Sequence, residues 1–268
     1  MTASHKAIAS PFSNLESASA AASRPVENPL AGLRVAITGG TSGLGLALVR
    51  ALLQGAAHVA FVARDRGRLE RLSRELIGGQ GICSDISRKE DIHPLAMQIV
   101  GMLGGLEVLI NNASNLGPTP LALLADTECE DFERALATNV LGPFRLTKAL
   151  LGSLAASARE GRGAVVVNIS TDAAVNAYAR WGAYSASKAA LRHLSAVWNE
   201  ELIGERVRVI SFDPGDMDTP MHAAALPDAD RTTLKRPDDA AHELVDVIVK
   251  ILVQQRADPG RLVGEVVQ

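Results

Sequence analysis

The sequence has few of the features that mark membrane, secreted or polyanion-binding proteins. No apolar run reaches the ~18 residues that a membrane-spanning helix requires, and no apolar signal segment follows Lys6. Only two cysteines occur, Cys83 and Cys129, so we expect reduced thiols and a cytoplasmic location rather than a disulfide framework. With 27 Lys and Arg against 30 Asp and Glu, the chain lacks the cationic excess that nucleic-acid binding needs.

Aromatic residues and clustered metal ligands are also scarce. Aromatics make up 3% of the chain, which argues against an aromatic-rich β-sandwich. His93, His193 and His222 stand apart without the spacing of metal ligands, so no metal site is expected. By contrast, 47% of the 268 residues are hydrophobic, which is enough for a sizeable core and argues against wholesale disorder.

The apolar residues form short, continuous runs that alternate with stretches of helical periodicity. Continuous runs are typical of parallel strands buried on both faces, and strand–helix alternation predicts βαβ units. We therefore predict an α/β fold, a single doubly wound parallel β-sheet flanked by helices, over residues 31–268. The expected strands are 33–38, 58–63, 107–110, 164–169 and 206–212, and the expected helices are 44–53, 66–76, 89–103, 130–156, 183–203 and 237–253.

Two segments depart from this regular pattern. Residues 1–30 are rich in Ala and Ser and lack hydrophobic periodicity, which predicts a disordered N-terminal tail; an organellar transit peptide is the alternative. Residues 216–236 are polar and Ala-rich, with Pro220 and Pro227 and little strand signal. A loop of this length in a compact domain is usually functional, so we expect a lid over a binding site.

A glycine-rich turn connects the first strand to the first helix. Gly39 permits a tight turn, Gly43 allows backbone to approach a pyrophosphate, and Gly45 allows close helix–strand packing. The free N–H groups of the helix N-terminus would then meet the phosphates. The alternative is an ordinary βα turn, but strand, turn and helix coincide here. The turn residues expected to bind a dinucleotide are Gly39, Thr41, Ser42, Gly43, Leu44 and Gly45.

The end of the second strand bears on the choice of dinucleotide. The strand ends at Ala63 and is followed by Arg64, whose guanidinium suits a ribose 2′-phosphate and favours NADP(H). Asp65 is the residue that would reverse this preference, since a carboxylate here binds the 2′-OH of NAD(H). After a further short strand, Asp85 and Ile86 are expected at the adenine; a helix N-cap is the alternative role of Asp85.

Four polar residues form a candidate catalytic set. Tyr184 and Lys188 are spaced i, i+4, which places both on one helix face, and a nearby ammonium lowers the pKa of a tyrosine. Ser170 follows the strand 164–169, at the carboxyl edge where open α/β sheets bind ligands. Asn139 lies among apolar neighbours of a predicted helix; its alternative role is that of a satisfied core amide.

With these motifs in order, the chain resembles the short-chain dehydrogenase/reductase family over residues ~33–255. The resemblance implies a Rossmann-like fold and hydride transfer between a nicotinamide and an alcohol or carbonyl. It implies that Tyr184 is the general acid/base, that Ser170 polarises the carbonyl and that Lys188 lowers the tyrosine pKa and holds the ribose. It also implies that Asn139 anchors a water in a proton relay. The matching residues are Gly39, Gly43, Gly45, Asn111, Asn112, Ala113, Asn139, Ser170, Tyr184, Lys188, Asp213, Pro214 and Gly215.

Three departures from the family pattern stand out. Ser114 replaces the usual Gly after Asn112-Ala113, and Asp172 puts a carboxylate near the mouth of the site. Residues 261–268 lack the usual closing sequence, which often contributes to a tetramer interface in relatives. A dimer through the helices 130–156 and 183–203 is therefore expected.

Together these inferences predict an NADP(H)-dependent oxidoreductase that acts on a small carbonyl compound or secondary alcohol. No nucleic-acid or membrane partner is expected. The alternatives are an NAD-linked alcohol dehydrogenase and a non-catalytic protein that senses NADP. Pro214, Gly215, Met217 and Thr219 are expected at the nicotinamide. The expected substrate residues are Ser114, Asp172, Tyr178, Trp181 and Met221.

Overall fold

The computed structural model describes residues 28–257. Its centre is a six-stranded, wholly parallel sheet in the order β3-β2-β1-β4-β5-β6, which confirms the predicted doubly wound fold. The third strand carried little sequence signal because it begins Gly-Gln-Gly. The strands are β1 (Arg34–Thr38), β2 (His58–Ala63), β3 (Gly79–Cys83), β4 (Val108–Asn111), β5 (Val165–Ile169) and β6 (Arg208–Phe212).

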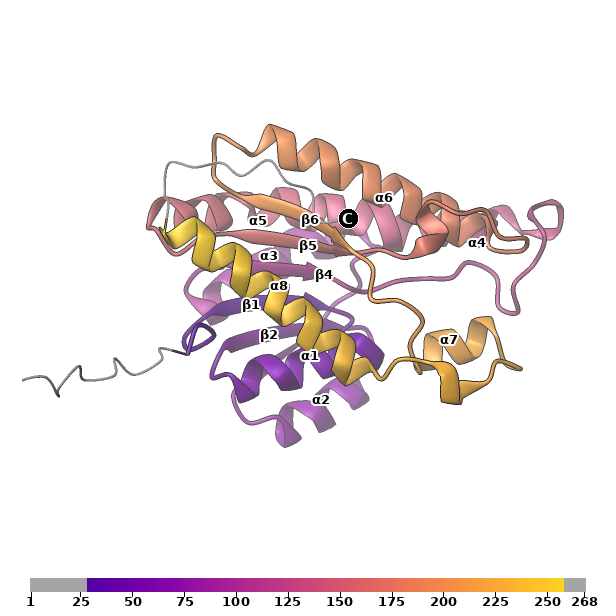
Figure 1. Cartoon of the computed structure of the whole chain (residues 1–268), viewed down its shortest axis with the longest axis horizontal. Coiled ribbons are helices and arrows are strands. Elements are labelled where there is room, and N and C mark those ends of the chain that lie inside the picture. Colours follow the sequence, from indigo (N-terminus) through magenta and orange to yellow (C-terminus); the bar gives the residue numbers. More distant parts are fainter. Residues whose placement is uncertain (1–27, 258–268) are drawn as a thin grey trace, which may run out of the picture.

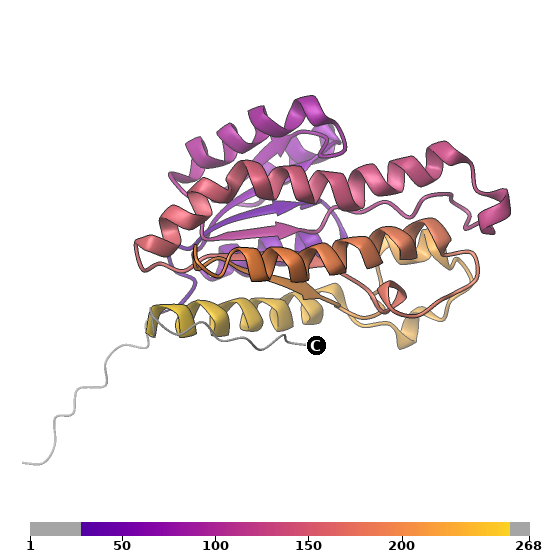
Figure 2. The same ribbon diagram turned by 90° about the horizontal axis from the view of Figure 1, so that it is seen from above.

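Helices cover both faces of the sheet. One face packs against α1 (Gly43–Gln54), α2 (Arg66–Glu75) and α8 (Pro237–Ala257), and the other against α3 (Lys89–Leu103), α5 (Gly142–Arg159) and α6 (Gly182–Glu201) (Figures 1 and 2). Because successive strand side chains point to opposite faces, neighbours in one strand enter different cores. In β1, Val35 and Ile37 join the core under α1 and α8, and Ala36 joins the core under α3 and α5.

The prediction of one continuous helix over residues 130–156 is wrong in the middle of that range, where a π-helical turn interrupts it. The chain forms α4 (Cys129–Leu136), a π-helical turn (Ala137–Leu141) and then α5. Pro143 has no N–H, so it donates no hydrogen bond to the carbonyl of Asn139 four residues back. The N–H of Gly142 bonds to Ala137 O, five residues back. The register therefore widens at Asn139, as π-turns often do at functional sites.

The segment 216–236 is more regular than predicted. It contains α7 (Pro220–Ala225) and a 3₁₀ turn (Arg231–Thr233), and α7 stands beyond the carboxyl ends of the strands (Figure 1). Its base is closed by hydrogen bonds from Lys235 N to Asp216 O, 2.9 Å, and from Asp218 N to Lys235 O, 3.0 Å. The segment is thus an arm whose base is closed by a parallel bridge between Met217 and Lys235.

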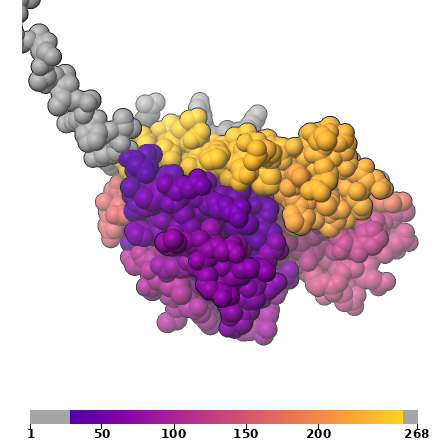
Figure 3. Space-filling model, turned by 90° about the horizontal axis from the view of Figure 1, so that it is seen from below, coloured from indigo at the N-terminus to yellow at the C-terminus, as the bar shows by residue number. Residues whose placement is uncertain are grey.

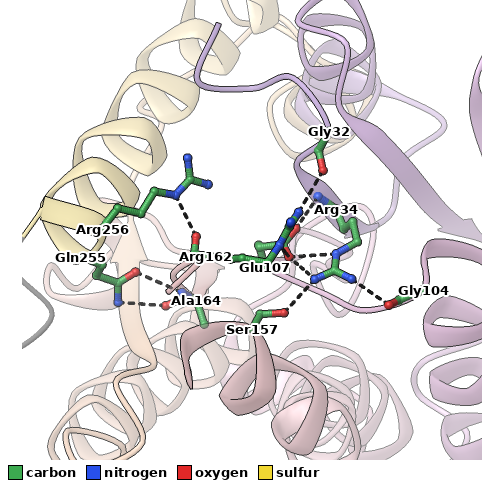
Figure 4. Close-up of polar contacts among 9 residues, drawn as sticks. All are labelled: Gly32, Arg34, Gly104, Glu107, Ser157, Arg162, Ala164, Gln255 and Arg256. Atoms are coloured by element: carbon green, nitrogen blue, oxygen red, sulfur yellow. Dashed lines mark hydrogen bonds and ion pairs between the residues drawn. The ribbon is translucent and has the colours of Figure 1, made fainter. Parts of the chain in front are cut away.

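A buried ion cluster lies at the opposite, amino edge of the sheet (Figure 4). The Glu107 carboxylate is fully buried and accepts hydrogen bonds from Arg34 N at 2.7 Å, Arg34 Nε at 2.8 Å and Arg162 Nε at 2.7 Å. Burial alone would raise the pKa of Glu107, but the hydrogen bonds from Arg34 and Arg162 hold it below its usual value. The cluster joins the starts of β1, β4 and β5.

The ends of the folded domain are also tied to this edge. Asn28 donates from Nδ2 to Gly55 O at 2.9 Å, and Leu30 packs against the core, so these residues belong to the domain and not to the predicted tail. Near the other end, Gln255 accepts from Ala164 N at 3.0 Å (Figure 4). Residues 1–27 of the predicted tail and the predicted divergence over 261–268 lie outside the described residues. Within residues 28–257, no helix has the length and apolar character to span a membrane.

Candidate active site

A cleft of about 430 Å³ opens at the carboxyl edge of the sheet. It is lined by residues that follow each of the six strands, together with the starts of α1 and α6 and with α7. In the space-filling view, the arm that carries α7 (orange) stands beside the N-terminal half of the chain (indigo to purple) (Figure 3). This is the edge at which open α/β sheets bind ligands.

The glycine turn at the floor of the cleft is packed too tightly for side chains. A Cβ on Gly45 would lie 2.2 Å from Gly39 O, and a Cβ on Gly39 would lie 2.9 Å from Ala113 Cα. Gly39 and Gly43 also have φ values of +71° and +49°, which favour glycine. Ser42 is the N-cap residue of α1 but its hydroxyl does not cap the helix. The turn therefore offers an open, side-chain-free helix N-terminus, which fits a pyrophosphate.

Residues beyond β2 and β3 line the far end of the cleft. Arg64 is two-thirds exposed, and its guanidinium lies 3.9 Å from the Asp85 carboxylate. Asp85 also accepts from Ser87 N at 3.0 Å, so it stabilises its own turn. The Asp65 carboxylate accepts from Arg68 N at 2.9 Å and caps α2. Arg64 and Asp65 are both exposed and both line the cleft, but one carboxylate oxygen of Asp65 is used to cap α2.

Asn112 and Thr38 connect the glycine turn to the loop after β4. Asn112 Nδ2 donates to Thr38 O at 2.9 Å and to Gly39 O at 3.2 Å. The Thr38 hydroxyl accepts from Asn112 N at 3.0 Å and from Ala113 N at 3.1 Å. The predicted cofactor residue Asn112 therefore positions the turn through its side chain. The role of Thr38 as an acceptor for these two N–H groups was not predicted, although Thr38 begins the turn motif.

Ser170, Tyr184 and Lys188 meet in the middle of the cleft. All three are buried, and all three line it. Lys188 Nζ donates to Ile169 O at 2.7 Å and lies 5.6 Å from the centre of the Tyr184 ring. The Ser170 hydroxyl is buried and has no hydrogen-bond partner. Of the buried side-chain atoms without a partner in the described residues, it is the one that lines the cleft, where a ligand group could supply the missing bond.

The environment shifts both titratable groups. Burial raises the pKa of Tyr184 to about 12, helped by the carboxylates of Asp213, Asp172 and Asp216, while a hydrogen bond with Ser114 lowers it. Burial lowers the pKa of Lys188 to about 8, against the attraction of Asp213. Burial is the largest influence on the pKa of Tyr184, and the hydrogen bond with Ser114 opposes it. The expected lowering of that pKa by Lys188 stays a prediction.

The side chain of Asn139 is fully bonded within the protein. Its Oδ1 accepts from Asn115 N at 2.8 Å and Ser114 Oγ at 3.1 Å, and its Nδ2 donates to Asn115 O at 2.7 Å and Ser187 Oγ at 2.8 Å. Ser187 in turn donates to Tyr184 O at 2.7 Å. All four positions of the amide are thus taken, so the side chain positions Ser114 and the Tyr184 helix. The expected relay water on Asn139 stays a prediction.

Most of the predicted site residues are brought together, and four are not. Asp172 and Tyr178 lie outside the cleft lining, and the Tyr178 hydroxyl donates to Asp172 at 2.6 Å. Gly45 and Asn139 lie behind the lining. Ser187, which links Asn139 to Tyr184, was missed although it stands inside the Tyr-x-x-x-Lys motif. The predicted residues that line the cleft are Gly39, Thr41, Ser42, Gly43, Leu44, Arg64, Asp85, Ile86, Asn112, Ala113, Ser114, Ser170, Trp181, Tyr184, Lys188, Pro214, Gly215, Met217, Thr219 and Met221.

Comparison with known proteins identifies the family. A family model described as short chain dehydrogenase matches residues 34–230. The chain belongs to the short-chain dehydrogenase family. This short-chain dehydrogenase is 32% identical to L-fucose dehydrogenase of Bos taurus over 216 residues, which cover 77% of each protein. It is therefore an oxidoreductase of that family.

Solved structures of similar fold hold nicotinamide dinucleotides. This short-chain dehydrogenase matches a 3-ketoacyl-(acyl-carrier-protein) reductase from Brucella melitensis complexed with NADH, at 25% identity and a TM-score of 0.76, over 82% of this chain and 91% of that one. It also matches a metagenomic short-chain oxidoreductase in complex with NADP, at 26% identity and a TM-score of 0.69, over 82% and 92%. In residues 28–257 no group of three acidic, His or Cys side chains is arranged to hold a metal ion.

Proposed function

We propose that this short-chain dehydrogenase uses NADP(H) to interconvert a small carbonyl compound and its secondary alcohol. The observation that carries the proposal is the buried, unpartnered hydroxyl of Ser170 beside Tyr184 and Lys188 in one cleft. A substrate oxygen placed there would receive the hydrogen bond that Ser170 lacks. Such a hydroxyl, aimed at the developing charge, stabilises the transition state of carbonyl reduction.

Tyr184 serves as the general acid in reduction and the general base in oxidation. Its raised pKa of about 12 keeps it protonated at neutral pH, which suits proton donation to a substrate oxygen. Lys188, held on Ile169 O, stabilises the tyrosinate that remains and binds the ribose hydroxyls. When bound, the nicotinamide supplies the hydride for reduction or accepts it in oxidation. Asn139 acts as a positioning residue through Ser114 and Ser187.

The preference for NADP(H) is supported by the end of β2. Arg64 lines the cleft and is largely exposed, so its guanidinium is accessible to a 2′-phosphate. Asp65, the residue that would favour NAD(H), caps α2 with its carboxylate. The glycine turn and the open start of α1 would hold the pyrophosphate.

A homodimer in a reducing, cytoplasmic compartment completes the proposal. Cys83 and Cys129 form no disulfide, as is usual for thiols of that compartment. Leu141 and Val197 leave about two-fifths of their surface exposed on the π-turn and α6, where the dimer contact is proposed. Light scattering of the purified chain tests this: a monomer at micromolar concentration would contradict it.

Parallel fluorescence titrations with NADPH and NADH, followed by turnover assays, test the function. We expect tighter NADPH binding, with turnover of a carbonyl panel. Tyr184→Phe should lose roughly 100- to 10,000-fold in turnover and retain NADPH binding. Preserved turnover in Tyr184→Phe, or NADPH binding without turnover across the panel, would contradict the proposal, and the second result would favour a sensor.

A further inference from the structure

The inner end of the cleft, next to Tyr184, has apolar walls. Leu116 follows β4, Trp181 precedes α6, and Met221 and Ala225 belong to α7; all four line the cleft. Leu116 and Ala225 are buried, and Trp181 and Met221 pack against them and against the Tyr184 ring as one cluster. Three distant segments of the chain thus build an apolar wall beside the proton donor.

The Trp181 ring is held against Tyr184. The two ring centres are 5.7 Å apart, with an interplanar angle of 60°, an edge-on contact that aromatic rings favour. Trp181 is the N-cap residue of α6, so the start of that helix fixes its backbone. The wall therefore offers a positioned aromatic surface to whatever binds beside the Tyr184 hydroxyl.

Three polar side chains near this wall are bonded to the protein itself. Ser114 donates to Asn139 at 3.1 Å, Asn115 Oδ1 accepts from Gly117 N at 2.7 Å, and Thr171 donates to Asp172 at 3.2 Å and accepts from Ala173 N at 3.3 Å. A polyhydroxylated substrate would bury several hydroxyls here and would need a partner for each. The wall thus disfavours sugars, although a relative is named L-fucose dehydrogenase.

Carboxylates near the site disfavour anions. Asp213 and Asp216 line the cleft. Together with Asp172 they raise the pKa of Tyr184. Their field would repel a carboxylate or a phosphate-bearing carrier such as a coenzyme A thioester. The carboxylates of the cleft and its apolar wall together favour uncharged carbonyl compounds that are not sugars.

We propose that the site takes an uncharged ketone bearing an aromatic or alicyclic ring, or the matching secondary alcohol, and that Trp181 and Met221 select it. This inference rests on the proposed function. In reduction the ketone carbon gains a hydride, with its two electrons, from the reduced dinucleotide, and the oxygen gains the Tyr184 proton. The C=O double bond becomes a CH–OH group, and the dinucleotide is oxidised.

A substrate panel with the full chain and NADPH tests the class. The panel contains acetophenone and cyclohexanone, the sugar L-xylulose and the thioester acetoacetyl-coenzyme A. We expect kcat/KM for the ring ketones to exceed that for the sugar and the thioester by at least roughly 100-fold. Faster turnover of the sugar or the thioester would overturn the inference and leave the proposed oxidoreductase intact. If no member is turned over while NADPH binds, the proposed function fails and this inference with it.

Variants of Trp181 test the selecting residue. Trp181→Ala should lower kcat/KM for acetophenone by roughly 10- to 100-fold, mainly through KM, and Trp181→Phe should restore most of it. Trp198→Phe is the matched control, because the second tryptophan of the chain packs on Phe144, with ring centres 5.9 Å apart, and does not line the cleft. Equal losses in Trp181→Ala and Trp198→Phe would contradict a selective role, and unchanged NADPH affinity in each variant excludes misfolding as the cause.

Discussion

The hydroxyl of Ser114 donates to Asn139 Oδ1 at 3.1 Å and, on its other side, lowers the pKa of Tyr184. Ser114 therefore connects the side-chain amide of Asn139 to Tyr184. On loss of the tyrosine proton, the serine hydroxyl can turn from Asn139 to the tyrosinate, and Asn139 Oδ1 keeps its bond from Asn115 N. The residue that replaces the family's usual glycine thus stabilises the charged form of Tyr184.

Ser114→Ala is expected to raise the pKa of Tyr184 further. Oxidation needs the tyrosinate, so its rate at pH 8 should fall roughly three- to tenfold. The pH at which reduction declines should move upward, because the protonated form persists to higher pH. Full pH–rate profiles in both directions measure this. Ser185→Ala is the control, since the Ser185 hydroxyl makes no hydrogen bond. A shift of equal size in both variants would contradict the role of Ser114.

Arg64→Ala should distinguish the two dinucleotides. Loss of a charge-assisted pair with the 2′-phosphate should weaken NADPH binding roughly 10- to 100-fold and leave NADH binding almost unchanged. Arg71→Ala, on the exposed surface of α2, is the matched control. Fluorescence titration with each dinucleotide measures the effect, and equal losses for NADPH and NADH would show that Arg64 does not bind the 2′-phosphate.

Gly45→Ala should disrupt the phosphate-binding turn. The new Cβ would lie 2.2 Å from the backbone oxygen of Gly39, which no side-chain rearrangement can relieve. We expect loss of dinucleotide binding together with a lower midpoint of thermal unfolding. Gly101→Ala is the control: it lies in α3 with nothing within 4 Å of the added Cβ, and it should raise helix stability by about 0.5–1 kcal/mol. Normal binding by Gly45→Ala would contradict the tight packing.

The sheet, the glycine turn and the cluster of Ser170, Tyr184 and Lys188 could be predicted because their signals are local. A continuous run such as Val165–Ile169 and the four-residue spacing from Tyr184 to Lys188 are visible in a short window of sequence. The π-turn depends on which carbonyl loses its donor at Pro143. The saturation of Asn139 depends on contacts with Asn115 and Ser187, 24 and 48 residues away. Such long-range bonds are not visible in a local pattern.

Glu107→Gln should destabilise the fold by up to about 3–5 kcal/mol, because it leaves the mostly buried Arg34 without its charge partner. Chemical denaturation at pH 7 measures this. Glu90→Gln, whose pair with Arg88 is exposed, should cost far less. The pKa of Glu107 is lowered in the folded state, so its stabilisation is complete above the unfolded pKa of ~4.3 and is lost as the pH falls through the folded pKa. Equal stability of the Glu107→Gln and wild-type chains would contradict this.

The Glu107 cluster (Figure 4) lies at the amino edge of the sheet, and the cleft lies at its carboxyl edge. Acid and base would therefore act on this protein by separate routes, acid through the carboxylate that joins three strands and base through the groups around Tyr184. Loss of activity at low pH would follow the fraction of folded molecules, whereas the profile at high pH would follow Tyr184 and Lys188. A stabilising change at the amino edge should extend the acid range in which the enzyme survives without altering the pH at which it works best.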